Sequence, residues 1–79
     1  MKLTLKYFGL IAEVLNKTEE IITLERTFTV GELLTQLVEK NSALKNIDFK
    51  IAVNQELANN DFIIVVDSEI ALLPPFAGG

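Results

Sequence analysis

The residues best suited to chemistry are the last six, Pro74-Pro75-Phe76-Ala77-Gly78-Gly79. They place a carboxylate after two glycines, and because glycine has no Cβ this end can enter a slot too narrow for other residues. The stiff Pro-Pro step projects the end away from the folded body. Average usage of Gly and Pro makes this combination a coincidence on the order of one in 100,000. We therefore predict that another protein's active site receives this end.

The rest of the chain is poor in catalytic groups. It has no His, Cys or Trp, so no side chain titrates near neutrality at its usual pKa and the best covalent nucleophile is missing. No spacing of oxygen ligands predicts a metal site. The acids Glu19, Glu20, Glu25 and Glu32 show no catalytic spacing. We expect no bound metal or cofactor, and the α-carboxylate of Gly79 remains as the reacting, catalytic group.

Length and composition predict one domain, residues 1–79, with residues 74–79 as its tail. Of the 79 residues, 49% are hydrophobic, and the net charge is −4. The basic residues are scattered, whereas nucleic-acid binding needs several cations on one face. No apolar stretch approaches the roughly 20 residues of a membrane span, and the start alternates like a strand rather than a signal peptide. We expect a cytoplasmic protein with no nucleic-acid or membrane partner.

The first half of the chain shows clear periodicities. Residues Lys2–Phe8 alternate like a strand, Gly9–Leu15 has the spacing of a short helix, and Glu20–Arg26 predicts an antiparallel second strand. Thr29 and Glu32 have capping-box spacing, flanked by a hydrophobic staple of Phe28 and Leu33. Apolar residues then recur at helical spacing up to a stop at Asn41. This segment predicts the main helix.

The second half predicts further strands. Phe49–Asn54 alternates, Phe62–Val66 is an apolar run with strand composition that we expect to be mainly core, and Glu69–Leu73 forms the last strand. Turn signals lie at Asn54-Gln55 and Asn59–Asp61. The order of elements indicates an α+β fold in which one main helix covers a mixed sheet. Together with the tail, it suggests a β-grasp, or ubiquitin-like, fold.

With these residues in view, the chain resembles the MoaD-type sulfur carriers, the small subunits of molybdopterin synthase. The resemblance runs through the whole length. It rests on Tyr7-Phe8-Gly9 with Glu13, Thr29-Val30-Gly31-Glu32-Leu33, Ala52-Val53-Asn54-Gln55, and Glu69-Ile70-Ala71-Leu72-Leu73-Pro74-Pro75-Phe76-Ala77-Gly78-Gly79. Two departures occur: Leu10 and Ala12 stand where relatives often have basic residues, and Val66-Asp67-Ser68-Glu69 replaces an Asp-Gly-Asp-Glu turn.

The resemblance implies a chemistry for the tail. A partner adenylating enzyme would use ATP to join Gly79 to AMP, and a sulfur donor would then convert the acyl-adenylate to a thiocarboxylate. The tail would enter the large synthase subunit and deliver sulfur to a pterin precursor during molybdenum cofactor biosynthesis. The chain would thus be part of a sulfurtransferase complex, in which family members assemble two small with two large subunits.

The resemblance also assigns contact residues. Pro74, Pro75, Phe76, Ala77 and Gly78 form the partner-binding tail, with Phe76 as an anchor. A docking surface is assigned to Phe8, Leu10, Leu72 and Leu73, where at least one of the three leucines should be exposed. Two alternatives stay open. One is a carrier for thiamine or tRNA thiolation or a ubiquitin-like protein tag, against which Pro74-Pro75 argues. The other is a binding module with an inert tail.

Overall fold

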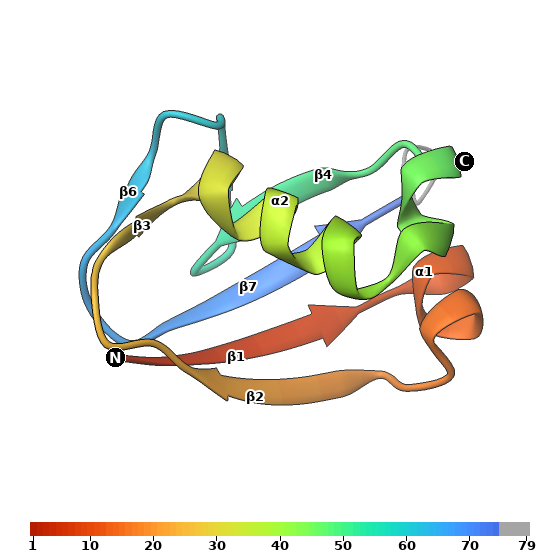
Figure 1. Cartoon of the computed structure of the whole chain (residues 1–79), viewed down its shortest axis with the longest axis horizontal. Helices are drawn as coiled ribbons and strands as arrows, with labels where there is room; N and C mark the ends of the chain where they lie inside the picture. The colour runs from red at the N-terminus through yellow and green to blue at the C-terminus, as the bar shows by residue number, and fades with distance from the viewer. Residues whose placement is uncertain (75–79) are drawn as a thin grey trace.

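Residues 1–74 form two sheets and two α-helices (Figure 1). A computed structural model of the chain describes residues 1–74. The strands are β1 (Lys2–Tyr7), β2 (Glu19–Thr23), β3 (Phe28–Thr29), β4 (Lys50–Val53), β5 (Glu56–Ala58), β6 (Ile63–Ile64) and β7 (Ser68–Leu73). The helices are α1 (Gly9–Leu15) and α2 (Val30–Lys40), with a 3₁₀ turn, η1, at Ser42–Asn46.

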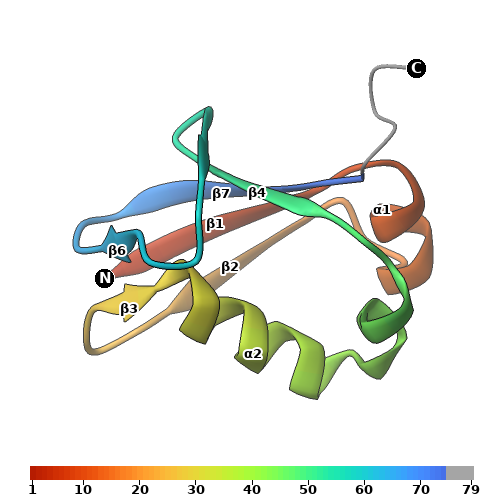
Figure 2. The ribbon, with the colours of Figure 1, turned by 90° about the horizontal axis from the view of Figure 1, so that it is seen from above.

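The larger sheet has the strand order β2-β1-β7-β4-β5. Strands β1 and β7 are parallel, and the other neighbours in this sheet are antiparallel. Helix α2 lies across one face, and the two-stranded sheet of β3 and β6 lies near its N-terminus (Figure 2). The predicted mixed sheet with one main covering helix is confirmed.

The core lies between α2 and the sheet. Alternation along the strands points one side chain in two toward the helix, and the helix contributes residues three or four positions apart. The largest fully buried side chains are Leu3, Leu5, Ile11, Val30, Leu33, Leu44, Ile64, Ile70 and Leu72. Every buried side-chain nitrogen or oxygen in residues 1–74 has a hydrogen-bond partner.

Helix α2 begins as its sequence predicts. The Glu32 amide donates to Thr29 Oγ1 at 3.1 Å, and the Thr29 amide donates to Glu32 Oε1 at 2.9 Å. Gly31 lies in the first turn after the cap, and its backbone amide donates to the Asn60 carbonyl at 3.0 Å. A Cβ on Gly31 would lie 3.3 Å from Asn60 atoms, so the close approach favours glycine. The sequence alone gives no reason for this glycine.

The expectation for Phe62–Val66 is wrong. Only Ile63–Ile64 forms a strand, and it pairs with the two-residue β3 outside the larger sheet. Ile64 is buried, whereas Phe62, Ile63, Val65 and Val66 are 47–62% exposed. An apolar run has strand composition wherever it lies, but a two-residue ladder at the side of the domain covers only the residue that faces the core. The short strands β3 and β5 are additional to the prediction.

Candidate functional site

Strand β7 is the base from which the tail departs. It lies between β1 and β4, with Leu72 opposite Tyr7 and Leu73 opposite Lys50. Pro74 is the last described residue, and the site residues Pro75, Phe76, Ala77, Gly78 and Gly79 lie outside the described part. A strand paired on both sides is held in register by two ladders. The tail therefore leaves from a well-anchored point.

Gly9 lies directly against Pro74. Its φ of +55° is in the left-handed region, and a Cβ at this position would lie 3.0 Å from Pro74 Cγ. Both the backbone conformation and the close approach favour glycine here. Figure 2 shows the same juxtaposition, with the end of β7 beside the start of α1. The start of α1 and the end of β7 thus meet at the point where the tail begins.

Apolar side chains are exposed on either side of Gly9. Phe8 is 44% and Leu10 is 51% exposed, so two residues assigned to the docking surface are available to a partner. Leu73 is half-buried. Exposed apolar groups next to the tail form a candidate contact surface, because such groups bury readily against a partner.

Leu72 does not belong to the docking surface that the sequence predicts. It is completely buried, because alternation along β7 points Ile70 and Leu72 toward α2 while Ala71 and Leu73 point to the open face. Its pairing with Tyr7 and Ile51, both buried, places it in the core. Leu72 supports the tail from inside and offers no surface to a partner.

The start of β7 is fixed by polar side chains at Val66-Asp67-Ser68-Glu69. The side-chain Oδ1 of Asn54 accepts from the backbone amide of Glu69 at 2.9 Å, and the backbone amide of Asn54 donates to the Glu69 carbonyl at 2.8 Å. Ser68 Oγ donates to the Val66 carbonyl at 2.8 Å, and the Lys2 amide donates to Asp67 Oδ1 at 2.7 Å. These bonds connect β7 to β4 and β1, so the site strand is positioned from its first residue.

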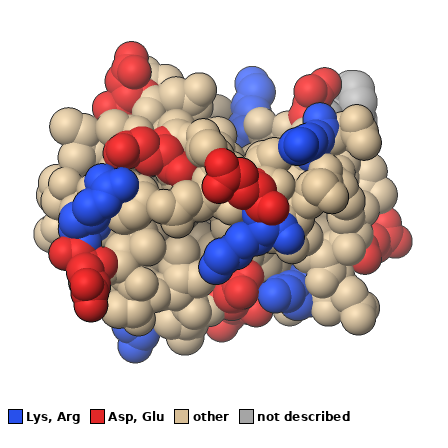
Figure 3. Space-filling model, in the orientation of Figure 1, with Lys and Arg blue, Asp and Glu red and all other residues tan. Residues whose placement is uncertain are grey.

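Three ion pairs lie at the surface of residues 1–74. Lys6 and Glu69 approach to 3.4 Å across β1 and β7, and Lys17 and Glu20 are also 3.4 Å apart. Figure 3 shows positive and negative side chains interspersed over the face that carries α2.

Within residues 1–74, no three His, Cys, Asp or Glu residues gather in a way that could hold a metal ion. Also within this range, no helix is long and apolar enough to cross a membrane.

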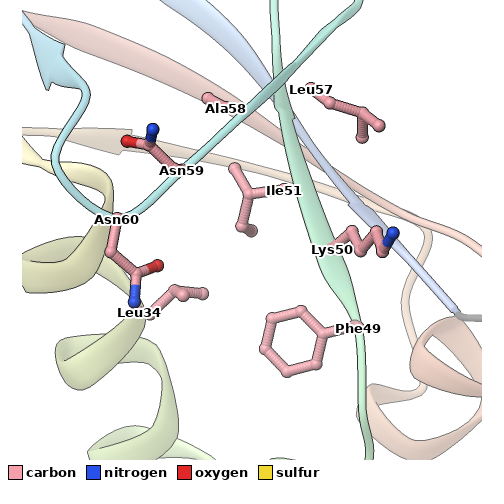
Figure 4. Close-up of a pocket in the computed structure, with 8 residues that line it drawn as sticks. All are labelled: Leu34, Phe49, Lys50, Ile51, Leu57, Ala58, Asn59 and Asn60. Carbon is pink, nitrogen blue, oxygen red and sulfur yellow. The ribbon is translucent and has the colours of Figure 1, made fainter.

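A cavity lies between α2 and the β4–β5 hairpin. It has a volume of about 490 Å³. Leu34, Phe49 and Ile51 extend into the space between the helix and β4 (Figure 4). Its remaining lining is Lys50, Leu57, Ala58, Asn59 and Asn60. An apolar cavity whose one ionisable group is a lysine is suited to contact rather than to acid–base chemistry.

Comparison with known proteins gives concordant results. The sequence profile of the ThiS family matches residues 5–79. A molybdopterin synthase sulfur carrier subunit from Mycobacterium tuberculosis is 30% identical over 82 residues, covering 100% of this chain and 99% of the relative. The crystal structure of SAMP1 from Haloferax volcanii covers both chains completely, with 26% identity and a TM-score of 0.82.

A third relative is part of a complex. The structure of subunits 1 and 2 of the molybdopterin-converting factor from Helicobacter pylori matches over 100% of both chains, with 26% identity and a TM-score of 0.70. The profile match covers far more than half of the residues, and the fold agrees with that of the ubiquitin-like relatives. The chain therefore belongs to the ThiS family, as a ubiquitin-like β-grasp protein of the ThiS and MoaD type of sulfur carrier.

Proposed function

We propose that this chain carries sulfur as a C-terminal thiocarboxylate on Gly79 for the synthesis of molybdopterin. The observation that carries the proposal is the ending Pro74-Pro75-Phe76-Ala77-Gly78-Gly79 after an anchored strand of a ThiS-family fold. The full-length similarity to a molybdopterin synthase sulfur carrier subunit supports this pathway. The side chains of the body would then position the tail rather than take part in bond making.

The chemistry requires activation, because a carboxylate is a poor electrophile. A partner adenylating enzyme joins the Gly79 carboxylate to the α-phosphate of ATP and releases pyrophosphate. A sulfur nucleophile then attacks the acyl carbon, and AMP leaves with the bonding electron pair. The resulting thiocarboxylate sulfur attacks a carbon of the pterin precursor in the second partner, and an oxygen substituent of that carbon leaves with the electron pair of its bond. The sulfur then joins the acyl group to the pterin, and it stays on the pterin when the acyl–sulfur bond is hydrolysed. Water finally attacks the acyl carbon and restores the carboxylate, so the chain acts as a covalent carrier.

Two partners follow from this cycle. One is the adenylating enzyme, and the other is a large synthase subunit, which the complex of the two Helicobacter subunits supports. We propose a cytoplasmic assembly of two small and two large subunits. Phe8, Leu10 and Leu73 would contact these partners, with Phe76 as the anchor of the tail. Holding the thiocarboxylate inside the partner raises its effective concentration at the pterin.

A second function has its own support. SAMP1 is a small archaeal modifier protein by name, and its similarity also spans the whole chain. A protein modifier would start from the same Gly79 adenylate but would transfer the acyl group to a lysine amine instead of accepting sulfur. The folded body alone does not distinguish sulfur carriage from protein modification. The acceptor of Gly79 does.

Intact-protein mass spectrometry tests the proposal. After incubation with a cognate adenylating enzyme, ATP and a sulfur donor, we expect the mass to change by the replacement of one oxygen with one sulfur. The loaded chain should then form molybdopterin with the large subunit and a pterin precursor. An unchanged mass would contradict the sulfur-carrier function, whereas lysine conjugates formed without sulfur loading would favour the modifier.

Two tail variants sharpen this test. Deletion of Gly79 should abolish loading and leave the melting temperature unchanged, because the reacting carboxylate is displaced but no core residue is altered. Gly78→Trp should remain folded but fail to transfer sulfur, since its indole cannot pass a channel shaped for glycine. Sulfur transfer by Gly78→Trp at the rate of the unchanged chain would contradict the threading argument.

A further inference from the structure

Strand β2 has an open hydrogen-bonding edge. It is the outermost strand on its side of the five-stranded sheet, and within residues 1–74 no strand pairs with its outer side (Figure 1). Its five residues include no proline. Unpaired strand edges of this kind template the addition of another strand unless they are blocked.

The groups that face outward follow from the ladder with β1. Met1 and Leu24 exchange two backbone bonds, each 2.8 Å, and the Tyr7 amide donates to the Thr18 carbonyl at 2.9 Å. In an antiparallel pair, hydrogen-bonded and non-hydrogen-bonded positions alternate. The register therefore points the amides and carbonyls of Glu19, Ile21 and Thr23 away from β1.

A cavity of about 130 Å³ opens beside this edge, lined by residues of β2 and α2. Its apolar part comes from Ile22, Leu33 and Leu37, of which both leucines are at most 5% exposed. The polar part comes from Lys17, Glu20, Gln36, Lys40 and Asn41. A space of this size accommodates one aliphatic side chain. A strand added to β2 would direct alternate side chains toward α2 and hence toward this cavity.

The charges around the cavity favour an acidic ligand. Its ionisable groups are two lysines and one glutamate, in a chain of net charge −4. The glutamate is already engaged, because Glu20 Oε1 accepts from the Tyr7 hydroxyl at 2.6 Å and Glu20 Oε2 lies 3.4 Å from Lys17 Nζ. Lys40 makes no ion pair within residues 1–74. Because Lys17 and Glu20 offset each other, the excess positive charge of the cavity lining is that of Lys40.

We propose that the groove between β2 and α2 binds an extended, acidic segment of a partner protein by strand addition. The segment pairs with Glu19, Ile21 and Thr23, places one aliphatic side chain over Leu33 and Leu37, and sets its carboxylates near Lys17 and Lys40. Backbone pairing supplies affinity in this mode, and the side-chain cavity and the charges supply specificity. This site shares no residue with the tail, and it goes beyond the proposed sulfur transfer.

Titration with synthetic peptides tests the site on the full chain. The probes are peptides of alternating valine and threonine with three aspartates at the N-terminal or the C-terminal end, and the same peptides with lysines instead. Amide exchange followed by NMR should slow at Glu19, Ile21 and Thr23 when an aspartate peptide binds, and the lysine peptides should bind more weakly. No change in exchange at these amides, or equal binding of both peptide sets, would overturn the proposal.

Proline substitution isolates the backbone contribution. Ile21→Pro removes an amide that faces solvent, so the ladder with β1 keeps its bonds. Its binding of the aspartate peptide should fall by at least about tenfold, whereas Ile21→Ala, which keeps the amide, should fall less than about threefold. Equal losses in the two variants would contradict strand addition. If Ile21→Pro fails to fold, the exchange measurement on the unchanged chain still decides.

Charge reversal isolates the electrostatic contribution. Lys40→Glu should weaken binding of the aspartate peptide by about three- to tenfold at low salt. Lys45→Glu makes the same change of net charge at a residue of η1 that does not line the cavity, and it should have little effect. If both variants weaken binding equally, the preference for aspartate peptides comes from the net charge of the chain, and the proposed role of Lys40 is wrong.

A dimer of the free chain that Ile21→Pro dissociates would instead assign the β2 edge to a second copy of this chain.

Discussion

Tyr7 connects the core to an ion pair at the surface. Its ring is 2% exposed, and its hydroxyl donates to Glu20 Oε1 at 2.6 Å. This bond, with help from Lys17, holds the pKa of the Glu20 carboxyl below its usual 4.5, and burial together with Glu20 raises the pKa of the Tyr7 hydroxyl. The same contact thus stabilises the charged carboxylate and the neutral phenol.

Replacement of Tyr7 by Phe should lower the free energy of unfolding by about 1 kcal/mol near neutral pH. Because the folded pKa of Glu20 is depressed, its contribution is present above pH 4.5 and is lost as the pH falls through the folded value. The difference between Tyr7→Phe and the unchanged chain should therefore shrink below pH 4.5. Urea unfolding at several pH values measures it, and a difference independent of pH would show that Glu20 ionisation is not involved.

Gly9 is the residue at which the conformation of α1 affects the tail. Gly9→Ala should cost about 1–2 kcal/mol, because a non-glycine residue in the left-handed region is strained. Its Cβ would also meet Pro74 Cγ at 3.0 Å, so we expect slower adenylation of Gly79. Adding Pro74→Ala removes the contact but not the strain. Compared with Pro74→Ala alone, the double variant should show the same rate of adenylation but a lower free energy of unfolding, and equal stability of these two variants would assign the effect to the contact alone.

At the scale of elements, β6 shows how an apolar run can lie outside the core. Ile64 is 1% exposed, whereas Val66 is 62% exposed. Ile64→Ala should therefore destabilise the fold by about 2–4 kcal/mol, and Val66→Thr should change stability by less than about 0.5 kcal/mol. Thermal unfolding of the two variants compares them. A comparable loss in both would restore the expectation that the whole run is core.

The elements that the sequence predicts are those with local signals. The capping box spans only Thr29 to Glu32, and the helix Gly9–Leu15 is bounded by residues beside it, so neither needs knowledge of distant partners. Strands β3 and β5 have two and three residues. Such short segments carry no measurable periodicity, and only their distant partners define them.

The candidate site divides in the same way. The tail could be predicted from the sequence because its residue types rarely occur together. The contact of Gly9 with Pro74 could not, because it joins residues far apart in the sequence through the parallel β1–β7 pair. The run Ala71-Leu72-Leu73 is apolar throughout, so it lacks the alternation that would reveal which side chain faces the core. Leu72 is assigned to the wrong face for this reason.

At the scale of the whole molecule, we expect the fold of residues 1–74 to be independent of residues 75–79. The most C-terminal residue of the buried core is Leu72, and the last strand ends at Leu73. The β2 edge and its cavity lie on the opposite edge of the sheet from β5, and they draw on no residue after Asn41. Folding, peptide binding and sulfur carriage are therefore expected to respond independently to changes at the C-terminal end.

Truncation after Pro74 tests this independence. Removal of residues 75–79 should leave the melting temperature within about 2 °C, since a shift of several degrees in a domain of this size requires about 1 kcal/mol. The truncated chain should bind the aspartate peptides at the β2 edge with unchanged affinity but accept no sulfur, because the Gly79 carboxylate is gone. A large loss of stability would instead show that residues 75–79 pack on the body and belong to its fold.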